Sequence, residues 1–255
     1  MAEKVIAKTV AHIHSVWSYD GKWELSKIAS FFGRLGYDVI LTAEHNRTFD
    51  KQRWENYKKS CREASTKRTL IIPGIEYSDE TNTIHVLVWG VSVLLGNNQP
   101  TGDLLRKATE KNGICVLAHP SRRKAWQQLD AAWLPLLHGL ELWNRKADGI
   151  APSREAIDLL KANSKLKPFV GLDFHRPNQL FPLSMMITIN GSLSPDSVFD
   201  SLRSGNYQSF ALGFPAIFFK SKPLFSCMIL LELFRGTLVK QLRHWKKKLK
   251  YGSTP

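Results

Sequence analysis

The stretch "VAHIHSVWSYDG", residues 10–21, places two histidines one residue apart at the end of an apolar run. In a β-strand, residues i and i+2 point to the same face, so His12 and His14 would project side by side. Two imidazoles on one face suit a shared metal ion, and Asp20 adds a carboxylate six residues after His14. The same spacing also arises by accident in a half-buried strand. The rest of the chain has to decide between these two interpretations.

The composition is that of an ordinary globular protein of 255 residues, 43% apolar and 23% charged. This length is compatible with a single barrel-like domain. The three cysteines, Cys61, Cys115 and Cys227, lie far apart and form neither a zinc-binding pair nor a disulfide framework. That usage favours a reducing compartment. Because the first ten residues lack the apolar core of a signal peptide, we expect a cytoplasmic protein, with peripheral membrane association as an addition.

The net charge of +14 is spread unevenly along the chain. From Lys220 onward, nine Lys and Arg residues face one acidic residue, Glu232, so this segment alone carries +8. Basic charge favours anionic partners such as phosphates, nucleic acid or an acidic membrane surface, and does not choose among them. A lysine-rich surface without such a partner is the alternative.

Strand-like and helix-like segments alternate along most of the chain. Helices are predicted over 23–36, 102–113, 153–164 and 194–206, from apolar stripes and from end signals such as Ser153, Ser194 and Gly36. Strands are predicted over 4–14, 38–45, 69–78, 84–91, 114–120, 139–144, 169–175 and 184–189. This alternation predicts an α/β fold built on parallel strands.

Imidazoles and carboxylates gather at the ends of these strands. They are His12, His14, Asp20, Glu44, His45, Glu76, His85, His119, Asp173 and His175. Only His85 precedes its apolar run instead of following it. In a barrel of parallel strands the carboxyl ends meet at one mouth, so these groups would converge. Imidazole and carboxylate together suit zinc, manganese or iron, and the number of ligands predicts two or three ions. Such clusters activate water for attack at phosphorus.

Six motifs in order, "HIHSVWSYDG", "LTAEHN", "PGIEYS", "IHVLVWG", "LAHPSRR" and "GLDFH", resemble those of the polymerase and histidinol phosphatase (PHP) family of metal-dependent phosphoesterases. The resemblance covers residues 7–212. It implies a distorted (β/α)7 TIM-like barrel with a trinuclear metal site. We therefore expect a PHP domain over 1–212 and a basic amphipathic tail over 213–255.

The same resemblance implies a distribution of nine ligands over three ions. His12, His14 and Asp173 would hold the first ion, with Glu76 bridging the first and second. His85 and His119 would complete the second ion. Asp20, His45 and His175 would hold the third.

Two departures from the family pattern stand out. Glu44 precedes His45 where the family usually has aspartate, and its expected role is to orient a ligand. The segment between His85 and His119 is short, where many relatives carry an insertion. We therefore expect a relatively open site without a cap.

Arginine forks match phosphate oxygens, and several arginines follow the motifs. Arg122 and Arg176 are the predicted substrate-positioning residues, with Arg123 beside them and Arg47 as a weaker candidate. A solvated surface arginine is the alternative for each.

Two further residues in or near the motifs have an open role. Asn144 could touch a ligand or be a satisfied loop amide. Trp17 could stack on a base or sugar or simply pack.

The tail repeats apolar residues at intervals of three and four, which predicts an amphipathic helix. They are Leu224, Met228, Leu231, Phe234, Leu238, Leu242, Trp245 and Leu249. Its apolar run is too short to span a bilayer. We expect a helix docked on the barrel or on a partner chain, with an interfacial membrane anchor as the alternative.

The predicted function is that of a metal-dependent phosphoesterase in which a metal-activated hydroxide attacks phosphorus. Small phosphate monoesters and nucleotide or oligonucleotide substrates are both compatible with the sequence. The alternative is a non-catalytic PHP module that binds an anionic partner or a membrane surface. The sequence leaves the oligomeric state open.

Overall fold

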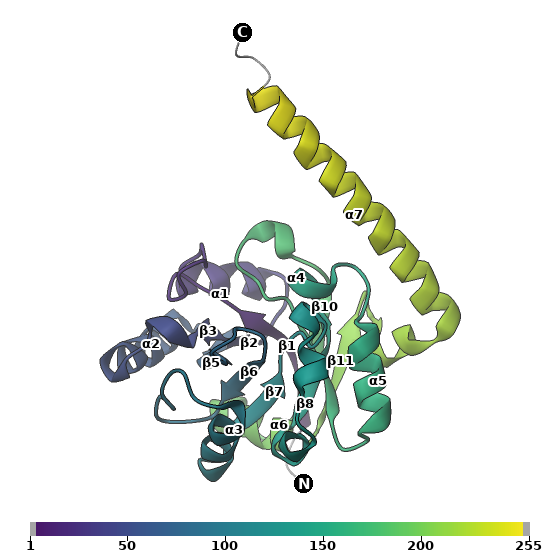
Figure 1. Ribbon diagram of the computed structural model, residues 1–255. Coiled ribbons are helices and arrows are strands. Elements are labelled where there is room, and N and C mark those ends of the chain that lie inside the picture. Colours follow the sequence, from purple (N-terminus) through teal and green to yellow (C-terminus); the bar gives the residue numbers. More distant parts are fainter. Residues whose placement is uncertain (1–3, 252–255) are drawn as a thin grey trace.

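The structure, a computed structural model, describes residues 4–251, except for the side chains at 220, 222, 243, 244 and 246–251. It is a mixed α/β fold in which the strands lie at the centre and most helices lie around them (Figure 1). The strands are β1 Lys4–Ile13, β2 Val39–Thr42, β3 Glu44–His45, β4 Leu70–Ile72, β5 Gly74–Ser78, β6 His85–Trp89, β7 Ile114–Leu117, β8 Gly139–Asn144, β9 Lys167–Gly171, β10 Leu183–Asn190, β11 Tyr207–Ala211 and β12 Phe214–Pro215.

The strands form two six-stranded sheets, in the orders β12-β11-β10-β1-β2-β4 and β3-β5-β6-β7-β8-β9. The chain crosses between them twice without a turn, because β2 continues through Ala43 into β3, and β4 continues through Pro73 into β5. On the other side, Ile13 at the end of β1 forms a parallel bridge with Phe174, just after β9. The two sheets are therefore joined at both sides, although a single closed sheet is not found among residues 4–251.

One glycine is required where the sheets meet. A side chain at Gly74 would approach the Trp89 ring to 2.2 Å and the Thr42 carbonyl oxygen to 2.6 Å. The Trp89 indole N–H donates to that same carbonyl at 2.7 Å. Since Trp89 is fully buried, a Cβ at position 74 would have no room.

The helices are α1 Leu25–Arg34, α2 Lys51–Ala64, α3 Thr101–Glu110, α4 Arg145–Asp148, α5 Arg154–Ala162, α6 Pro195–Arg203 and α7 Lys222–Tyr251. The four helices predicted ahead of the tail are all present. Ser153 and Ser194 cap α5 and α6 with their hydroxyl oxygens, which accept from backbone N–H groups of the first turn. Helix α2 was not predicted, because it is very polar and buries only Trp54, Tyr57 and Cys61.

The expectation of parallel strands throughout was wrong in part. Strand β6 runs antiparallel to both β5 and β7, and β10 runs antiparallel to β1. The reversal explains why His85 precedes its apolar run. Because β6 is reversed, its first residue lies at the edge where its neighbours end, and His85 is paired with Ser78 at the end of β5.

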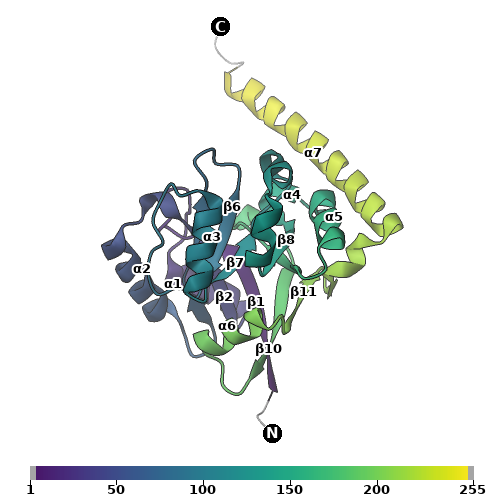
Figure 2. The same ribbon diagram turned by 60° about the horizontal axis from the view of Figure 1, so that its bottom comes forward.

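The tail begins packed on the body and then leaves it. Strand β12 pairs with β11, and Phe225 and Met228 in the first two turns of α7 are buried. Beyond them α7 projects as a long single helix (Figures 1 and 2). Among the described residues, no helix is both long enough and apolar enough to cross a membrane. The domain boundary at residue 212 stays a prediction.

Candidate metal site

The opening His-x-His lies where β1 bends. His12 has a positive φ of 60°, and the pairing of β1 with β2 shifts register between Ala11 and Ile13. The backbone is held there by hydrogen bonds with the segment after β9: Phe174 N donates to the His12 carbonyl and His14 N donates to the Phe174 carbonyl. The two imidazole centroids lie 5.1 Å apart. The predicted side-by-side arrangement is present, on an irregular strand end.

Positive φ angles recur at three of the predicted ligands. His12, His119 and Asp173 have φ values of 60°, 28° and 49°. Non-glycine residues adopt this region at a cost, and such strain persists where the surrounding structure fixes it, often at functional sites. Each of the three ends a strand or follows one closely, so the unusual backbone turns the side chain into the common centre.

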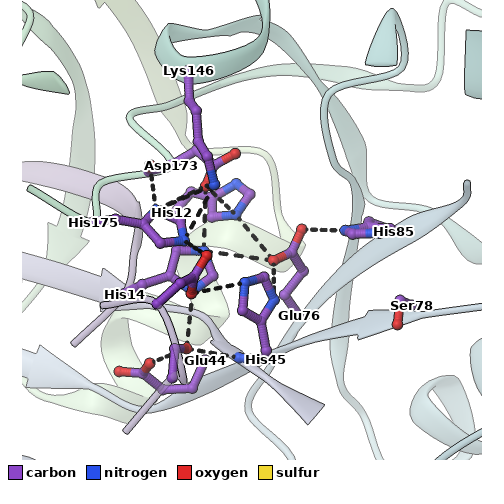
Figure 3. Close-up of polar contacts among 12 residues, drawn as sticks. His12, His14, Glu44, His45, Glu76, Ser78, His85, Lys146, Asp173 and His175 are labelled. Atoms are coloured by element: carbon purple, nitrogen blue, oxygen red, sulfur yellow. Dashed lines mark hydrogen bonds and ion pairs between the residues drawn. The ribbon is translucent and has the colours of Figure 1, made fainter. Parts of the chain in front are cut away.

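Glu76, on β5, lies at the middle of the cluster with 1% of its surface exposed (Figure 3). Its Oε1 is 2.6 Å from His85 Nδ1 and 2.9 Å from His119 Nε2. Its Oε2 is 2.9 Å from His45 Nδ1. The same Oε2 is 3.5 Å from His14 Nε2 and 3.6 Å from His12 Nε2.

Two aspartates complete the cluster. Asp173 Oδ1 lies 3.5 Å from His14 Nε2 and 3.3 Å from His175 Nδ1. Asp20 bridges two imidazoles, with Oδ2 3.0 Å from His175 Nε2 and Oδ1 3.4 Å from His45 Nε2. The structure thus brings all nine predicted ligands into one continuous network.

Several of these groups are buried without a hydrogen-bond partner among the described residues. They include His12 Nε2, His14 Nε2, Glu76 Oε2 and Asp20 Oδ1. Buried polar atoms normally have partners, so a set of unpartnered nitrogens and oxygens facing one another requires an explanation. Four overlapping groups of three ligating atoms lie within 4.8 Å, which fits divalent cations. These groups are His14-His45-His175, His12-His119-Asp173, His12-His14-Glu76 and Glu76-His85-His119.

The protonation states of the cluster are mixed. Burial lowers the pKa of His12, but the carboxylates around it outweigh burial and raise this pKa well above the usual value, so the imidazole must release a proton when an ion binds. Glu76 and His14, in contrast, are shifted toward the forms that bind metal. Burial raises the pKa of Glu76, but the positive charges of His85, His12 and His45 outweigh it and hold the pKa well below its usual value. Burial together with the charge of His175 lowers the pKa of His14 well below its usual value. A carboxylate and an unprotonated imidazole are the forms that bind metal.

Glu141, on β8, contacts two of the predicted ligands and was not singled out in the sequence. Its Oε1 is 2.8 Å from His12 Nδ1, while its Oε2 accepts from the His119 backbone N–H at 2.8 Å and from Asn144 Nδ2 at 2.8 Å. The bond fixes the His12 ring so that Nε2 faces Glu76. The available signal was a carboxylate inside the apolar run "GLELWN", all of which is buried.

Asn144 is a satisfied amide rather than a group facing the cavity. Besides its bond to Glu141, its Oδ1 accepts from the Ala147 N–H and caps α4. Of the two interpretations of Asn144 left open by the sequence, the contacts support the second.

Glu44 fixes the segment that follows His14 by accepting hydrogen bonds from it. Its carboxylate accepts from the Ser15 N–H and from the hydroxyls of Ser15 and Ser18. Ser18 Oγ in turn lies 3.1 Å from His14 Nδ1 and accepts from the His45 N–H at 3.0 Å. Glu44 therefore contacts the ligands through Ser18, in line with the orienting role expected for it.

The cluster opens into a cavity of about 250 Å³ whose rim carries basic and aromatic side chains. Tyr19 is 66% exposed and stacks on His45 at a centroid distance of 5.0 Å. Arg122 and Arg47 line the cavity, and Arg122 Nη1 donates to the Asn82 carbonyl at 2.9 Å. Tyr19 was not singled out in the sequence.

The other candidates lie elsewhere. Arg176 is exposed and does not line this cavity, and Arg123 donates to the carbonyls of Thr81 and Asn82. The Trp17 ring packs between Phe49, Tyr57 and Arg53, as the packing alternative predicts.

Lys146, on α4, is a second missed residue. Its Nζ is 3.2 Å from Asp173 Oδ1 and 3.2 Å from His175 Nε2 (Figure 3). It also lines a neighbouring groove of about 640 Å³, which shares Arg122 and Asp173 with the cavity and reaches Ile229 on α7. The ammonium group is thus within reach of both hollows.

Comparison with known proteins places the fold. No family model matches the sequence, and no curated protein matches it significantly. Among solved structures, a two-domain Bacteroides vulgatus protein containing a predicted PHP-like metal-dependent phosphoesterase is 20% identical with a TM-score of 0.60, over 83% of this chain and 66% of that one. PsfC from Pseudomonas syringae is 13% identical with a TM-score of 0.59, over 91% and 99%.

Endonuclease Q, in complex with a duplex substrate that carries an abasic lesion at the active site, is also similar. It is 16% identical with a TM-score of 0.57, over 78% of this chain and 57% of that one. This chain therefore spans about two thirds or less of the length of two of these three neighbours. The resemblance seen in the motifs is confirmed at the level of structure: the chain has the fold of a PHP-like metal-dependent phosphoesterase.

Proposed function

We propose that this protein is a metal-dependent phosphoester hydrolase that acts from the nine-ligand cluster. The observation that carries the proposal is the set of buried nitrogens and oxygens around Glu76 that face one another without hydrogen-bond partners. We infer that the strands close into a distorted seven-stranded barrel through the bridge between Ile13 and Phe174, with the cluster at its mouth. The PHP-like fold of the structural neighbours supports this architecture.

The ligands divide into three neighbouring sites. His12, His14 and Asp173 form one site, and the Glu76 carboxylate lies between it and the pair His85 and His119. Asp20, His45 and His175 form the third. Mixed imidazole and carboxylate ligands suit manganese, zinc or iron, and the overlap of the groups supports two or three ions.

Bound divalent ions would supply a water of lowered pKa and would neutralise charge that develops on the phosphoryl oxygens. The residues of the chain do the rest. Arg122 and Lys146 are placed to hold phosphate oxygens, Arg47 adds positive charge at the rim, and Glu141 and Glu44 keep the histidines in position.

The exposed Tyr19 ring and the two connected hollows favour a substrate with a flat ring and more than one phosphate, such as an oligonucleotide, over a small monoester. The DNA complex of Endonuclease Q supports the same class. Arg176 remains a proposed substrate contact only if a substrate extends beyond the cavity.

The test is hydrolysis of p-nitrophenyl phosphate, its bis-ester and single-stranded and abasic duplex oligonucleotides by protein loaded with Mn²⁺, Zn²⁺ or Fe²⁺. We expect metal-stimulated cleavage that is lost in His12→Ala. A non-catalytic PHP module that binds an anionic partner would bind metal and oligonucleotide but turn over none of these substrates. Equal turnover by wild type and His12→Ala would reveal a contaminating enzyme and leave the proposal without support.

A further inference from the structure

We propose that α7 is an interfacial helix that binds an anionic lipid surface. It has two distinct faces. Phe225 and Met228 are buried against the body, and Glu232 Oε2 accepts from the Ile150 N–H at 2.9 Å. These three positions follow one another at intervals of three and four residues, so they form one docking face. The docking face ends with Glu232.

The other face of α7 is apolar and exposed. Leu231, Phe234 and Leu238 are 52%, 65% and 42% exposed, and Leu242 and Trp245 are 61% and 67% exposed. They recur at intervals of three and four residues, which places them on one stripe. The side chain of Leu249, the last residue predicted for this stripe, lies outside the described residues. A contiguous exposed stripe of large apolar side chains marks a surface that is covered in use.

The charge of the segment indicates which kind of partner covers the apolar stripe. The chain from residue 220 onward carries nine basic residues and one acidic residue, and that acid is already paired with Arg235 and with the body. Two copies of α7 packed along their stripes would bring like charges together. A nucleic acid would match the lysines but would leave Leu, Phe and Trp in water. An anionic bilayer surface satisfies both, because the apolar stripe enters the acyl boundary while the basic residues meet the headgroups.

The same geometry excludes a spanning helix. Glu232 and Arg235 interrupt the apolar run, and no described helix is apolar enough to cross a bilayer. A helix of this kind lies in the plane of the interface. Since Ile229 of α7 lines the groove that it shares with Lys146 and Asp173, a lipid-bound α7 would hold that rim near the surface.

The test is flotation of the full-length protein with vesicles of phosphatidylcholine alone or with added phosphatidylserine. We expect at least about tenfold stronger binding to the anionic vesicles, weakened by salt. The triple variant Leu238→Gln, Leu242→Gln, Trp245→Gln should bind at least about tenfold more weakly. As a matched control, Leu35→Gln, Leu180→Gln, Leu193→Gln removes three exposed leucines elsewhere and should bind like wild type.

The triple stripe variant should retain wild-type hydrolysis of a soluble phosphoester and wild-type metal content. Loss of lipid binding and loss of the proposed hydrolase activity are therefore separate results. Lys240→Gln combined with Arg243→Gln should reduce the preference for phosphatidylserine, because seven of the nine basic residues remain. Absence of flotation, or flotation unchanged in the stripe variant, would overturn the proposal. So would a dimer in analytical ultracentrifugation that the stripe variant abolishes without any lipid binding, or oligonucleotide binding by α7 in place of lipid binding.

Discussion

The candidate metal site and α7 both depart from the usual pattern of burial, but in opposite ways: the site buries polar and charged groups, and α7 exposes apolar ones. The site buries seven imidazole and carboxylate side chains and partly buries two more, His45 and Asp20, whereas α7 exposes a row of leucines with a phenylalanine and a tryptophan. Soluble domains usually do the reverse, because burying charge and exposing apolar surface both cost free energy. Each departure therefore points to a partner that the chain alone does not supply.

The two regions differ in how strongly they are held. The cluster lies among strand ends, with backbone strain at His12, His119 and Asp173 and supporting bonds from Glu44 and Glu141. Helix α7 is attached by about two turns and a single carboxylate, Glu232. A preorganised site suits small ions at fixed distances, and a loosely attached amphipathic helix suits a surface of variable shape.

The largest expected effect comes from removing the central ligand of the site. Glu76→Gln deletes a charge that contacts five imidazoles, so we expect loss of bound metal and a fall in hydrolysis of about a thousandfold or more. Metal content by inductively coupled plasma mass spectrometry and kcat on a phosphodiester measure the effect. Glu110→Gln, an exposed glutamate at the end of α3, is the matched control. Full metal occupancy in Glu76→Gln would show that the cluster is not centred on this carboxylate.

The second effect contrasts the two faces of α7. Phe225→Ala removes a buried anchor beneath the Arg154 guanidinium and should weaken docking of the first turns by about 3 kcal/mol or more. Leu238→Ala, on the exposed stripe, should change the local free energy by less than about 0.5 kcal/mol. Hydrogen exchange of the amides in residues 225–232 reports both. Equal effects would mean that the stripe is packed in solution.

Glu141 should have an intermediate effect on the site. Glu141→Gln keeps the shape but weakens the bond that orients His12, and we expect metal affinity to fall by about 10- to 100-fold. Because Glu141 acts through His12, saturating metal should restore most of kcat. Titration of activity with Mn²⁺ gives both quantities. A loss of kcat that excess metal does not restore would instead place Glu141 in direct contact with the reaction.

The last prediction concerns the pH dependence of stability and Asp148, which lines the groove between the site and α7. Burial raises its pKa to about 7, so the folded protein keeps a proton that the unfolded chain releases at about pH 4. Unfolding therefore releases a proton between these values, and the free energy of unfolding falls as pH rises, by up to about 1.4 kcal/mol per pH unit.

Asp148→Asn should remove this part of the pH dependence, because an amide does not titrate. Urea unfolding at several pH values between about 5 and 8 compares the variant with wild type. Asp158→Asn, an exposed aspartate on α5, is the control and should leave the slope unchanged. Parallel slopes for wild type and Asp148→Asn would show that Asp148 titrates normally.

The sequence predicted most of the elements and the nine candidate ligand positions, because both are local properties. A stripe and a Ser cap specify α5 and α6, and a polar group at the end of an apolar strand run is visible without any contact. Helix α2 was not predicted because few of its residues are buried in the core. Glu141 was not singled out because the role of a buried carboxylate becomes visible only from the groups that it contacts.

Tertiary structure alone decided the direction of β6, the position of Lys146 beside the cluster and the environment of α7. In the sequence, His85 is the one predicted ligand that precedes its apolar run. The antiparallel pairing of β6 explains this, because it places the start of β6 at the edge where β5 ends. The sequence pattern of the α7 stripe would be the same in a buried and in an exposed helix. Periodicity shows which residues share a face, but not what covers that face. Contacts between distant segments settle such questions, because strand direction and burial depend on neighbours that the local sequence does not contain.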